Sequence, residues 1–357
     1  MADSETGLLF SPAGAYNSIR DHAKTIARRL RERAVQFLCG AGMSRPLGLP
    51  LSSHLAKSFL ADLFSVGMSD EEQQGELKEL ADRYSLESIA GAYLKKKDDP
   101  SLAKLVAESV GEATGDVHES RSHKALAYLA NNGYIDRIYT TNFDLLIERL
   151  LAQRACTITD LNVSSLPHEL GKKIPVIHLH GVPETGCRIT ELETYQLDTP
   201  ISDIFKADLV THHFVMVGYR LADADLRGIY FQLQEKLNAG RAFRKPYVVH
   251  TLGRGDKAPV SYLEAELARL VWEARGATFV PAAAEEFLPA IVDSLRRLEV
   301  EQEAQSLAEK FGLDPQSEDA VNEVWNRARS LCTELGIRDE VKGLKMLAQR
   351  HGVKVRP

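Results

Sequence analysis

Three short stretches of the chain place polar side chains directly after a run that has the pattern of a buried strand. They are Thr140-Thr141-Asn142-Phe143-Asp144, Ile177-His178-Leu179-His180-Gly181, and GYRLADADLR from Gly218 to Arg227. Among these side chains histidine, with an unperturbed pKa of about 6.5, is well suited to general-base work at neutral pH. Because parallel strands end at one edge of their sheet, where α/β proteins bind ligands, we expect these side chains to meet there.

Each stretch also has a structural interpretation. Asn142 could cap the following helix, with Asp144 in the first turn, where the helix dipole favours an anion. Strand alternation puts His178 and His180 on one face. His178, set back in its strand, is typical of a hydrogen-bonded core histidine, whereas His180 stands at the strand end beside Gly181. Helix capping would explain Asp223 and Asp225 equally well.

A glycine turn precedes all three stretches. Val35–Cys39 has the pattern of a strand buried on both faces, Gly40-Ala41-Gly42 follows, and Leu51–Leu63 is amphipathic at helical spacing. This order lets backbone N–H groups approach a phosphate. The third glycine of a dinucleotide fingerprint would fall at Arg45, so a simple strand-to-helix turn is an equally valid interpretation.

The elements that must position these residues are strands alternating with helices. Strand patterns occur at Val35–Cys39, Arg137–Thr141, Ile174–Leu179, Phe214–Gly218, Pro246–Thr251 and Ala277–Val280. Helical patterns follow several of them, at Leu145–Arg154, Asp225–Leu237 and Glu285–Leu298. The alternation predicts an α/β fold with a Rossmann-like, doubly wound parallel sheet of about six strands.

Three other segments have a different character. Residues 1–15 are predicted to be a flexible N-terminus, and 16–298 to be the α/β domain, with a helical insertion at about 69–132. Beyond 298 the strand patterns stop, and residues 299–357 predict a C-terminal helical appendage suited to docking another subunit.

Composition narrows the functional class. The 357 residues carry a net charge of −6, which argues against broad nucleic-acid binding. Four widely spaced cysteines without a C-x-x-C pair argue against a disulfide framework or a zinc knot. With no long apolar run and no signal-peptide pattern, we expect a cytoplasmic protein without membrane contact.

Taken together, the motifs resemble the sirtuin family over roughly residues 20 to 285. The motifs are GAGMS at 40–44, GLP at 48–50, TTNFD at 140–144, LHG at 179–181 and GYRLADADLR at 218–227. TELETY at 190–195 resembles the prokaryotic branch. Segment 181–217 holds one cysteine, Cys187, so the two cysteine pairs of the deacylases' zinc module are absent. Arg220 replaces a usual serine, and the family's cofactor-loop arginine has no counterpart near Leu51. The chain is most similar to bacterial sirtuin-like NAD⁺ hydrolases of antiphage defence.

The resemblance implies cleavage of the nicotinamide–ribose bond of NAD⁺, with NAD⁺ as substrate and with neither zinc nor another metal. It implies that Asn142 positions water or the ribose hydroxyls, that His180 is the general base, and that Asp144 binds nicotinamide or orients the ribose. The implied NAD⁺-binding positions are Gly40, Ala41, Gly42, Ser44, Thr141, Gly218 and Asp223.

The resemblance also implies a regulated defence effector that depletes NAD⁺ in abortive infection. We expect a homo-oligomer, a partner such as a HerA-type ATPase or an Argonaute, or both. Three alternatives stay open: an NAD⁺-dependent protein deacylase, a non-catalytic sensor that binds NAD⁺ or ADP-ribose, and an enzyme that transfers ADP-ribose.

Overall fold

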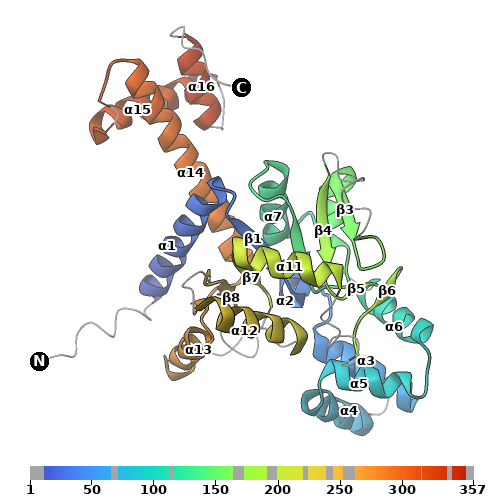
Figure 1. Cartoon of the computed structure of the whole chain (residues 1–357). Coiled ribbons are helices and arrows are strands. Elements are labelled where there is room, and N and C mark those ends of the chain that lie inside the picture. Colours follow the sequence, from blue (N-terminus) through green and yellow to red (C-terminus); the bar gives the residue numbers. More distant parts are fainter. Residues whose placement is uncertain are drawn as a thin grey trace, which may run out of the picture.

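A seven-stranded parallel sheet forms the centre of the molecule (Figure 1). The computed structural model describes residues 12–65, 71–111, 116–163, 173–190, 199–219, 224–238, 244–251, 262–314, 316–335 and 340–350. The sheet order is β3-β4-β2-β1-β7-β8-β9. Its strands are β1 (Val35–Cys39), β2 (Ile138–Thr140), β3 (Ala155–Ile158), β4 (Ile174–His178), β7 (His213–Val217), β8 (Tyr247–Val249) and β9 (Thr278–Val280). The predicted doubly wound α/β class is confirmed, and β3 is the strand that the sequence patterns missed.

The strand order reverses beside β1. From β1 the chain builds β2, β3 and β4 on one side, then crosses to build β7, β8 and β9 on the other. Val35 pairs with His213 across β1 and β7, and Phe37 pairs with Ile138 across β1 and β2. All five β1 residues are buried, as the apolar run predicts. The carboxyl ends of β1 and β7 therefore mark the topological switch point, the place where such sheets bind ligands.

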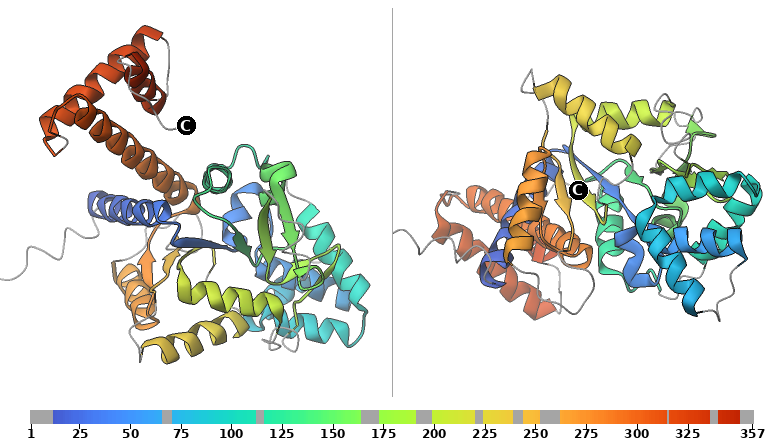
Figure 2. Two further views of the ribbon diagram at one scale, coloured as in Figure 1. Left: turned by 45° about the horizontal axis from the view of Figure 1, so that its top comes forward. Right: turned by 90° about the horizontal axis from the view of Figure 1, so that it is seen from below.

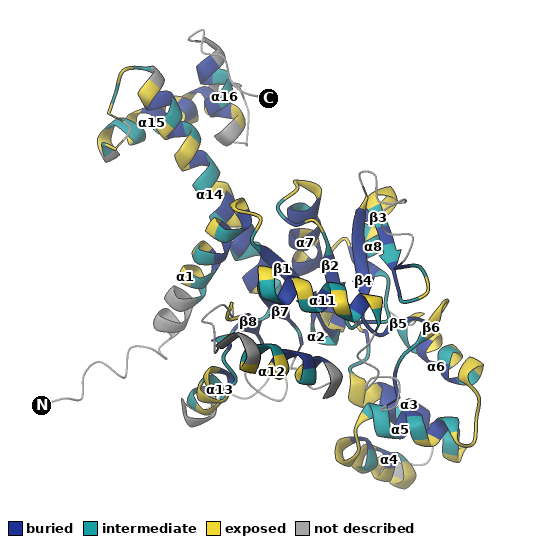
Figure 3. Cartoon of the chain, viewed as in Figure 1, coloured by how far each residue is buried: buried dark blue, intermediate teal, exposed yellow. Residues whose placement is uncertain are grey.

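Helices cover both faces of the sheet, and the strands between them are buried (Figures 2 and 3). One face carries α1 (Pro12–Arg31), α7 (Arg121–Asn131), α8 (Leu146–Leu151) and the start of α14 (Ala284–Lys310). Their first core includes Ile26, Leu126, Val176, Phe287, Leu288 and Ile291. The other face carries α11 (Pro200–Thr211), α12 (Ala224–Asn238) and α13 (Tyr262–Ala274), whose second core includes Tyr139, Ile177, Phe205, Tyr230 and Trp272. Helix α1 begins at Pro12, inside the segment predicted to be flexible, and residues 1–11 lie outside the described ranges.

Four helices form a separate lobe beside the carboxyl edge of the sheet (Figure 1). They are α3 (Ser52–Phe64), α4 (Glu71–Arg83), α5 (Leu86–Leu94) and α6 (Asp99–Gly111). The insertion core contains Leu55, Phe59, Ala90, Tyr93, Val106 and Ile189, with Phe143 and Cys187 packed against it. The lobe thus begins earlier than the predicted 69–132, and α7 belongs to the sheet because it packs in the first core.

The C-terminal helices stand away from the sheet, beyond α1 (Figures 1 and 2). The end of α14 packs with α15 (Glu318–Leu335) and α16 (Glu340–Arg350) around a bundle core of Val300, Leu307, Val324, Leu331 and Leu344. Helix α14 runs unbroken from Ala284 to Lys310. The predicted boundary between 298 and 299 therefore falls inside one helix, which serves two cores.

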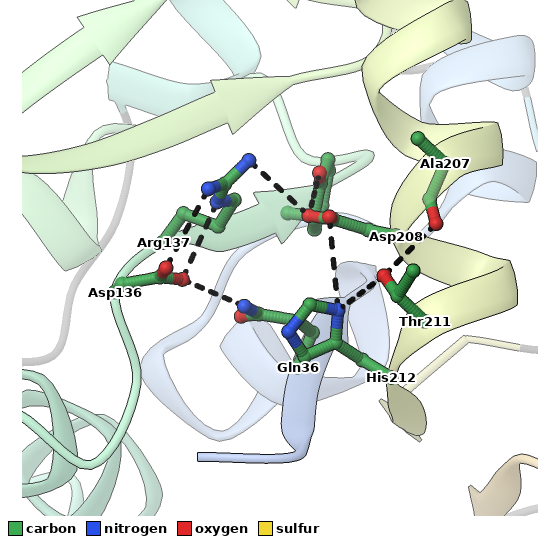
Figure 4. Close-up of polar contacts among 8 residues, drawn as sticks. Gln36, Asp136, Arg137, Ala207, Asp208, Thr211 and His212 are labelled. Carbon is green, nitrogen blue, oxygen red and sulfur yellow. Dashed lines mark hydrogen bonds and ion pairs between the residues drawn. The ribbon is translucent and has the colours of Figure 1, made fainter.

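Polar side chains tie the strands together at the amino edge of the sheet (Figure 4). Gln36, the one polar residue of β1, donates a 2.7 Å hydrogen bond to Asp136 before β2. Arg137 bridges Asp136 to Asp208 of α11, with 3.4 Å between its guanidinium and the Asp208 carboxylate. This network pairs the amide nitrogen of Gln36, whereas its amide oxygen is buried without a hydrogen-bond partner in the described residues.

Candidate active site

The carboxyl ends of β1, β2 and β4 continue their pairing for one residue beyond the strands. The Thr141 nitrogen donates to the Cys39 carbonyl at 3.0 Å, and the Leu179 nitrogen to the Thr140 carbonyl at 2.9 Å. The stretch from Thr140 to Asp144 is thereby brought beside the end of β1, and the stretch from Ile177 to Gly181 beside the end of β2.

Gly40, Gly42 and Gly218 pack against one another at the switch point. The Gly40 nitrogen donates to Val217 at 2.9 Å, and the Gly42 nitrogen to Gly218 at 3.0 Å. Gly218 has a φ of +64°, and a β-carbon there would lie 2.3 Å from the Met43 nitrogen. These glycines are thus required by close contact between two backbones, before any ligand is considered. The predicted loop is also partly helical, with α2 (Ala41–Ser44) and a 3₁₀ turn at Arg45–Leu47.

Asn142 is buried and faces the glycine turn. Its side-chain nitrogen donates to the Ser44 hydroxyl at 3.1 Å, and its backbone nitrogen to the Thr140 hydroxyl at 3.0 Å. Its amide oxygen Oδ1 is buried without a hydrogen-bond partner in the described parts of the chain. The helix-cap interpretation of Asn142 is wrong, because α8 starts at Leu146 with Leu145 at its N-cap.

Asp144 takes the helix-end role instead. Its carboxylate accepts a 3.1 Å hydrogen bond from the Leu146 nitrogen, and the Ser44 hydroxyl also bonds to it. Burial raises the Asp144 pKa, and these hydrogen bonds offset only part of the rise. Ser44 therefore joins Asn142 to Asp144. The burial of Cys39 itself, together with the Asp144 charge, raises the pKa of the Cys39 thiol, which disfavours the thiolate form there.

His178 is the core histidine that the sequence predicts. Its side chain is fully buried, with Nδ1 2.9 Å from the Asn142 carbonyl and Nε2 2.8 Å from the Glu148 carboxylate. Thr157 of β3 donates to the same carboxylate oxygen at 3.1 Å. Sequence reasoning missed Glu148 and Thr157, since no local spacing connects either residue to His178.

His180 lies two residues beyond the end of β4, in the turn before the β5–β6 hairpin (Gly181–Val182 and Gly186–Cys187). Strand alternation therefore does not extend to it. It is 8% exposed, and its ring centroid lies 6.4 Å from that of Phe143, the neighbour of Asn142. Its carbonyl accepts a 2.8 Å hydrogen bond from the Arg188 nitrogen, which fixes the turn.

Buried polar atoms without a hydrogen-bond partner gather at this edge. In the described ranges they include Oδ1 of Asn142, Oε2 of Glu148, Oγ1 of Thr159 and Oδ1 of Asp160. Thr159 and Asp160 directly follow β3, the neighbour of β4. Buried polar groups are nearly always paired in folded proteins, so such a concentration is typical of a ligand site.

The structure leaves part of the predicted site undescribed. Asp223, Arg220 and residues 191–195 of the TELETY stretch lie outside the described residues. Gly218 lies at the switch point, and Thr141 lies on the other side of β1, where its nitrogen bonds to the Cys39 carbonyl. Within the described ranges, no group of three or more His, Cys, Asp and Glu side chains is arranged to hold a metal ion. Among the described helices, none has the length and apolar character needed to cross a bilayer.

Comparisons with known proteins agree with the motifs. Residues 136–279, which include Asn142, Asp144, His180 and Gly218, match the model of a SIR2-like domain. The NAD(+) hydrolase ThsA of Cytobacillus dafuensis is 27% identical over 177 residues, which is 45% of this chain and 34% of that protein. The match thus spans about a third of the relative's length. A solved structure described as "Structural Basis for the Mechanism and Regulation of Sir2 Enzymes" is 18% identical, with a TM-score of 0.42, over 78% of this chain and 99% of that one. The predicted resemblance to the sirtuin family is confirmed by the first two of these comparisons, and the SIR2-like match covers residues 136–279.

Proposed function

We propose that the protein hydrolyses the bond between nicotinamide and ribose in NAD⁺, releasing nicotinamide, ADP-ribose and a proton. The partly aligned relative is named an NAD(+) hydrolase, which supports this substrate and reaction. The site supplies the kinds of group the reaction needs, an amide and an imidazole, at the ligand-binding edge of the sheet.

One observation carries the proposal, namely the buried Asn142 oxygen without a hydrogen-bond partner in the described residues. The other end of the amide is held by Ser44, so the oxygen has a fixed direction. A buried acceptor that lacks a partner costs free energy, roughly 1–3 kcal/mol, which a bound hydroxyl or water would recover. A ribose hydroxyl or the attacking water is such a donor.

The proposed reaction passes through an oxocarbenium-like ribose, because nicotinamide leaves as a neutral molecule. Water adds to C1′ of the ribose while His180 accepts the water proton. Asn142 holds the water or the ribose hydroxyls. Asp144, whose pKa is raised by burial, orients the ribose or nicotinamide end. No metal is required for this leaving group.

We place the pyrophosphate of NAD⁺ near the glycine turn, among Gly40, Ala41, Gly42 and Ser44, with Thr141, Gly218 and Asp223 bordering the rest of the molecule. The nitrogens of Gly40 and Gly42 already bond to β7 and its end. The remaining donors of this turn must therefore make the phosphate contacts. The glycines contribute by letting the two backbones meet.

We further propose that the protein is an antiphage effector that depletes NAD⁺ on activation. The motif resemblance supports this role. Homo-oligomerisation and a partner such as a HerA-type ATPase or an Argonaute are part of the same proposal, and the projecting C-terminal helices offer the docking surface.

The test is NAD⁺ consumption by purified protein at several protein concentrations, alone and with candidate partners, with products resolved by chromatography. Asn142→Ala and His180→Ala should each lower kcat by about 10²-fold or more. Asn132→Ala and His54→Ala, both exposed, are matched controls that should keep wild-type activity.

Other products would point to the alternatives. Deacylation of an acyl-lysine peptide, or ADP-ribose attached to protein or nucleic acid, would replace hydrolysis with deacylation or transfer. Tight NAD⁺ binding without turnover under every condition would favour a sensor.

A further inference from the structure

We infer that Glu148 and His178 are positioning residues that hold Asn142 in its working geometry. The inference rests on the proposed function, because Asn142 is the group that would contact water or ribose. Glu148 lies on α8 and His178 on β4, and the sequence motifs assign neither residue a catalytic role.

The hydrogen-bond chain runs in one direction. The Asn142 carbonyl can only accept, so His178 Nδ1 must carry a proton and donate to it, over 2.9 Å. Nε2 then shares one proton with Glu148 over 2.8 Å, either as imidazolium with carboxylate or as imidazole with carboxylic acid. In both states the histidine ring is held by its two nitrogens. Its tautomer toward Asn142 is therefore fixed.

This chain fixes the Asn142 backbone on both sides. The Thr140 hydroxyl accepts from the Asn142 nitrogen at 3.0 Å, and His178 holds the carbonyl. With both backbone groups held, the side chain is directed at Ser44, 3.1 Å away. A catalytic group displaced by about 1 Å can lose about 10²-fold in rate, so a group that prevents this shift acts on kcat.

Packing alone does not account for the pair. The His178 and Glu148 side chains are 0% and 11% exposed, and replacing a buried ionic pair by apolar residues is often neutral or stabilising. Glu148 also keeps one buried oxygen without a partner in the described residues. Through the Thr157 hydrogen bond to Glu148, the pair connects α8, β3 and β4 to Asn142, which the proposed chemistry uses.

The test compares Glu148→Gln with Glu148→Leu. A glutamine amide can donate to Nε2 of a neutral His178, which keeps Nδ1 protonated toward Asn142, so Glu148→Gln should keep kcat near the wild-type value. Glu148→Leu releases His178 and should lower kcat by about 10²-fold, with little change in KM for NAD⁺. His178→Leu should match it, and the double variant should lose no more, because both changes break one chain.

Gln36→Leu is the matched control for stability. It removes a hydrogen bond to a carboxylate at the opposite edge of the same sheet, 2.7 Å long (Figure 4). We expect a lower melting temperature with unchanged kcat. If Glu148→Leu keeps kcat, or if Gln36→Leu loses kcat to the same extent at equal loss of stability, the positioning role is wrong.

Crystal structures of the two Glu148 variants give a readout that needs no turnover. The Asn142–Ser44 contact should persist in Glu148→Gln and be lost in Glu148→Leu, and an unmoved Asn142 in the leucine variant would overturn the inference. An inactive wild type, or an active Asn142→Ala, would instead count against the proposed function. The two failures are therefore distinguishable.

Discussion

The nitrogen of Gly42 donates a 3.0 Å hydrogen bond to the carbonyl of Gly218, 176 residues later in the chain (218 − 42). This contact closes the switch point between β1 and β7 by backbone alone. The geometry of the candidate site therefore depends on the absence of two side chains as much as on the presence of Asn142 and His180.

Gly218→Ala should disrupt the switch point. Its β-carbon would lie 2.3 Å from the Met43 nitrogen, and φ is +64°. Gly133→Ala is the control, with φ at +74° and nothing within 4 Å of the added carbon. In the control, the free energy of unfolding should fall only by the strain of alanine in a left-handed conformation, roughly 1–2 kcal/mol, as measured by urea unfolding. Gly218→Ala should lower the free energy of unfolding by clearly more than this. It should also lose NAD⁺ binding, as measured by calorimetry. Equal losses in the two variants would show that the contact is not tight.

Glu285 of α14 caps the amino end of α7. Its carboxylate accepts from the Ser120 hydroxyl at 2.7 Å, the Ser122 hydroxyl at 2.6 Å and the Arg121 nitrogen at 2.8 Å. Burial raises the Glu285 pKa, but these hydrogen bonds outweigh it and the net pKa is below 4.5. The carboxylate thus stabilises the fold above pH 4.5, and the contribution disappears as pH falls through the lowered pKa. Glu285→Gln should cost about 1 kcal/mol at pH 7 and less at pH 3, by urea unfolding. A cost that does not change with pH would contradict this assignment.

His123 should make stability fall on mild acidification. Burial lowers its pKa from 6.5 to about 4, although Glu285 opposes the shift. Between these values the unfolded chain binds the proton and the folded chain does not, so stability decreases as pH falls. The contribution lost between pH 7 and pH 5 is about 2 kcal/mol. The stability difference between wild type and His123→Leu should narrow by that amount, which urea titrations at the two pH values would measure. A constant difference would place the titration elsewhere, for example at His213, whose pKa is also lowered to about 4.

Substituting two leucines of helix α14 should destabilise two different hydrophobic cores. Leu288 of α14 lies in the first core and Leu307 in the bundle core, and both are buried. Each change to alanine should cost about 2–5 kcal/mol in its own core. We expect two transitions by differential scanning calorimetry, with Leu307→Ala lowering only the one that belongs to the C-terminal bundle. A single transition shifted by both variants would mean that α14 couples the cores into one folding unit.

The sequence predicts those parts of the fold that a local pattern encodes. The ends of β1 are predicted to the residue because Val35–Cys39 is bounded by a charged turn and a glycine. Strand β3 is missed because Ala155–Ile158 lies at the edge of the sheet, where half-buried positions alternate with buried ones and no continuous apolar run forms. The prediction divides helix α14 after Leu298 because the helix passes there from the first core to the bundle core. The helix itself continues without a break.

The candidate site divides in the same way. Asn142 and His180 each follow a strand by two residues, and β2 and β4 are parallel neighbours, so topology alone predicts that both lie at the same edge of the sheet. Glu148 is found only in the folded chain, because its partner His178 is 30 residues away and on another element. The roles of the glycines also needed the fold, since Gly40 and Gly42 meet Gly218 only after the sheet has formed.

The pairing of β1 with β7 has a consequence for synthesis on the ribosome. Val35 finds its partner His213 only after the residues between them have been made. Contacts this distant in sequence form slowly, because the intervening chain must first be brought together. A nascent chain that ends before β7 lacks one wall of the switch point, so it cannot assemble the complete site. Termination before β7 would therefore release a fragment in which β1 has no partner on that side and the switch point is incomplete.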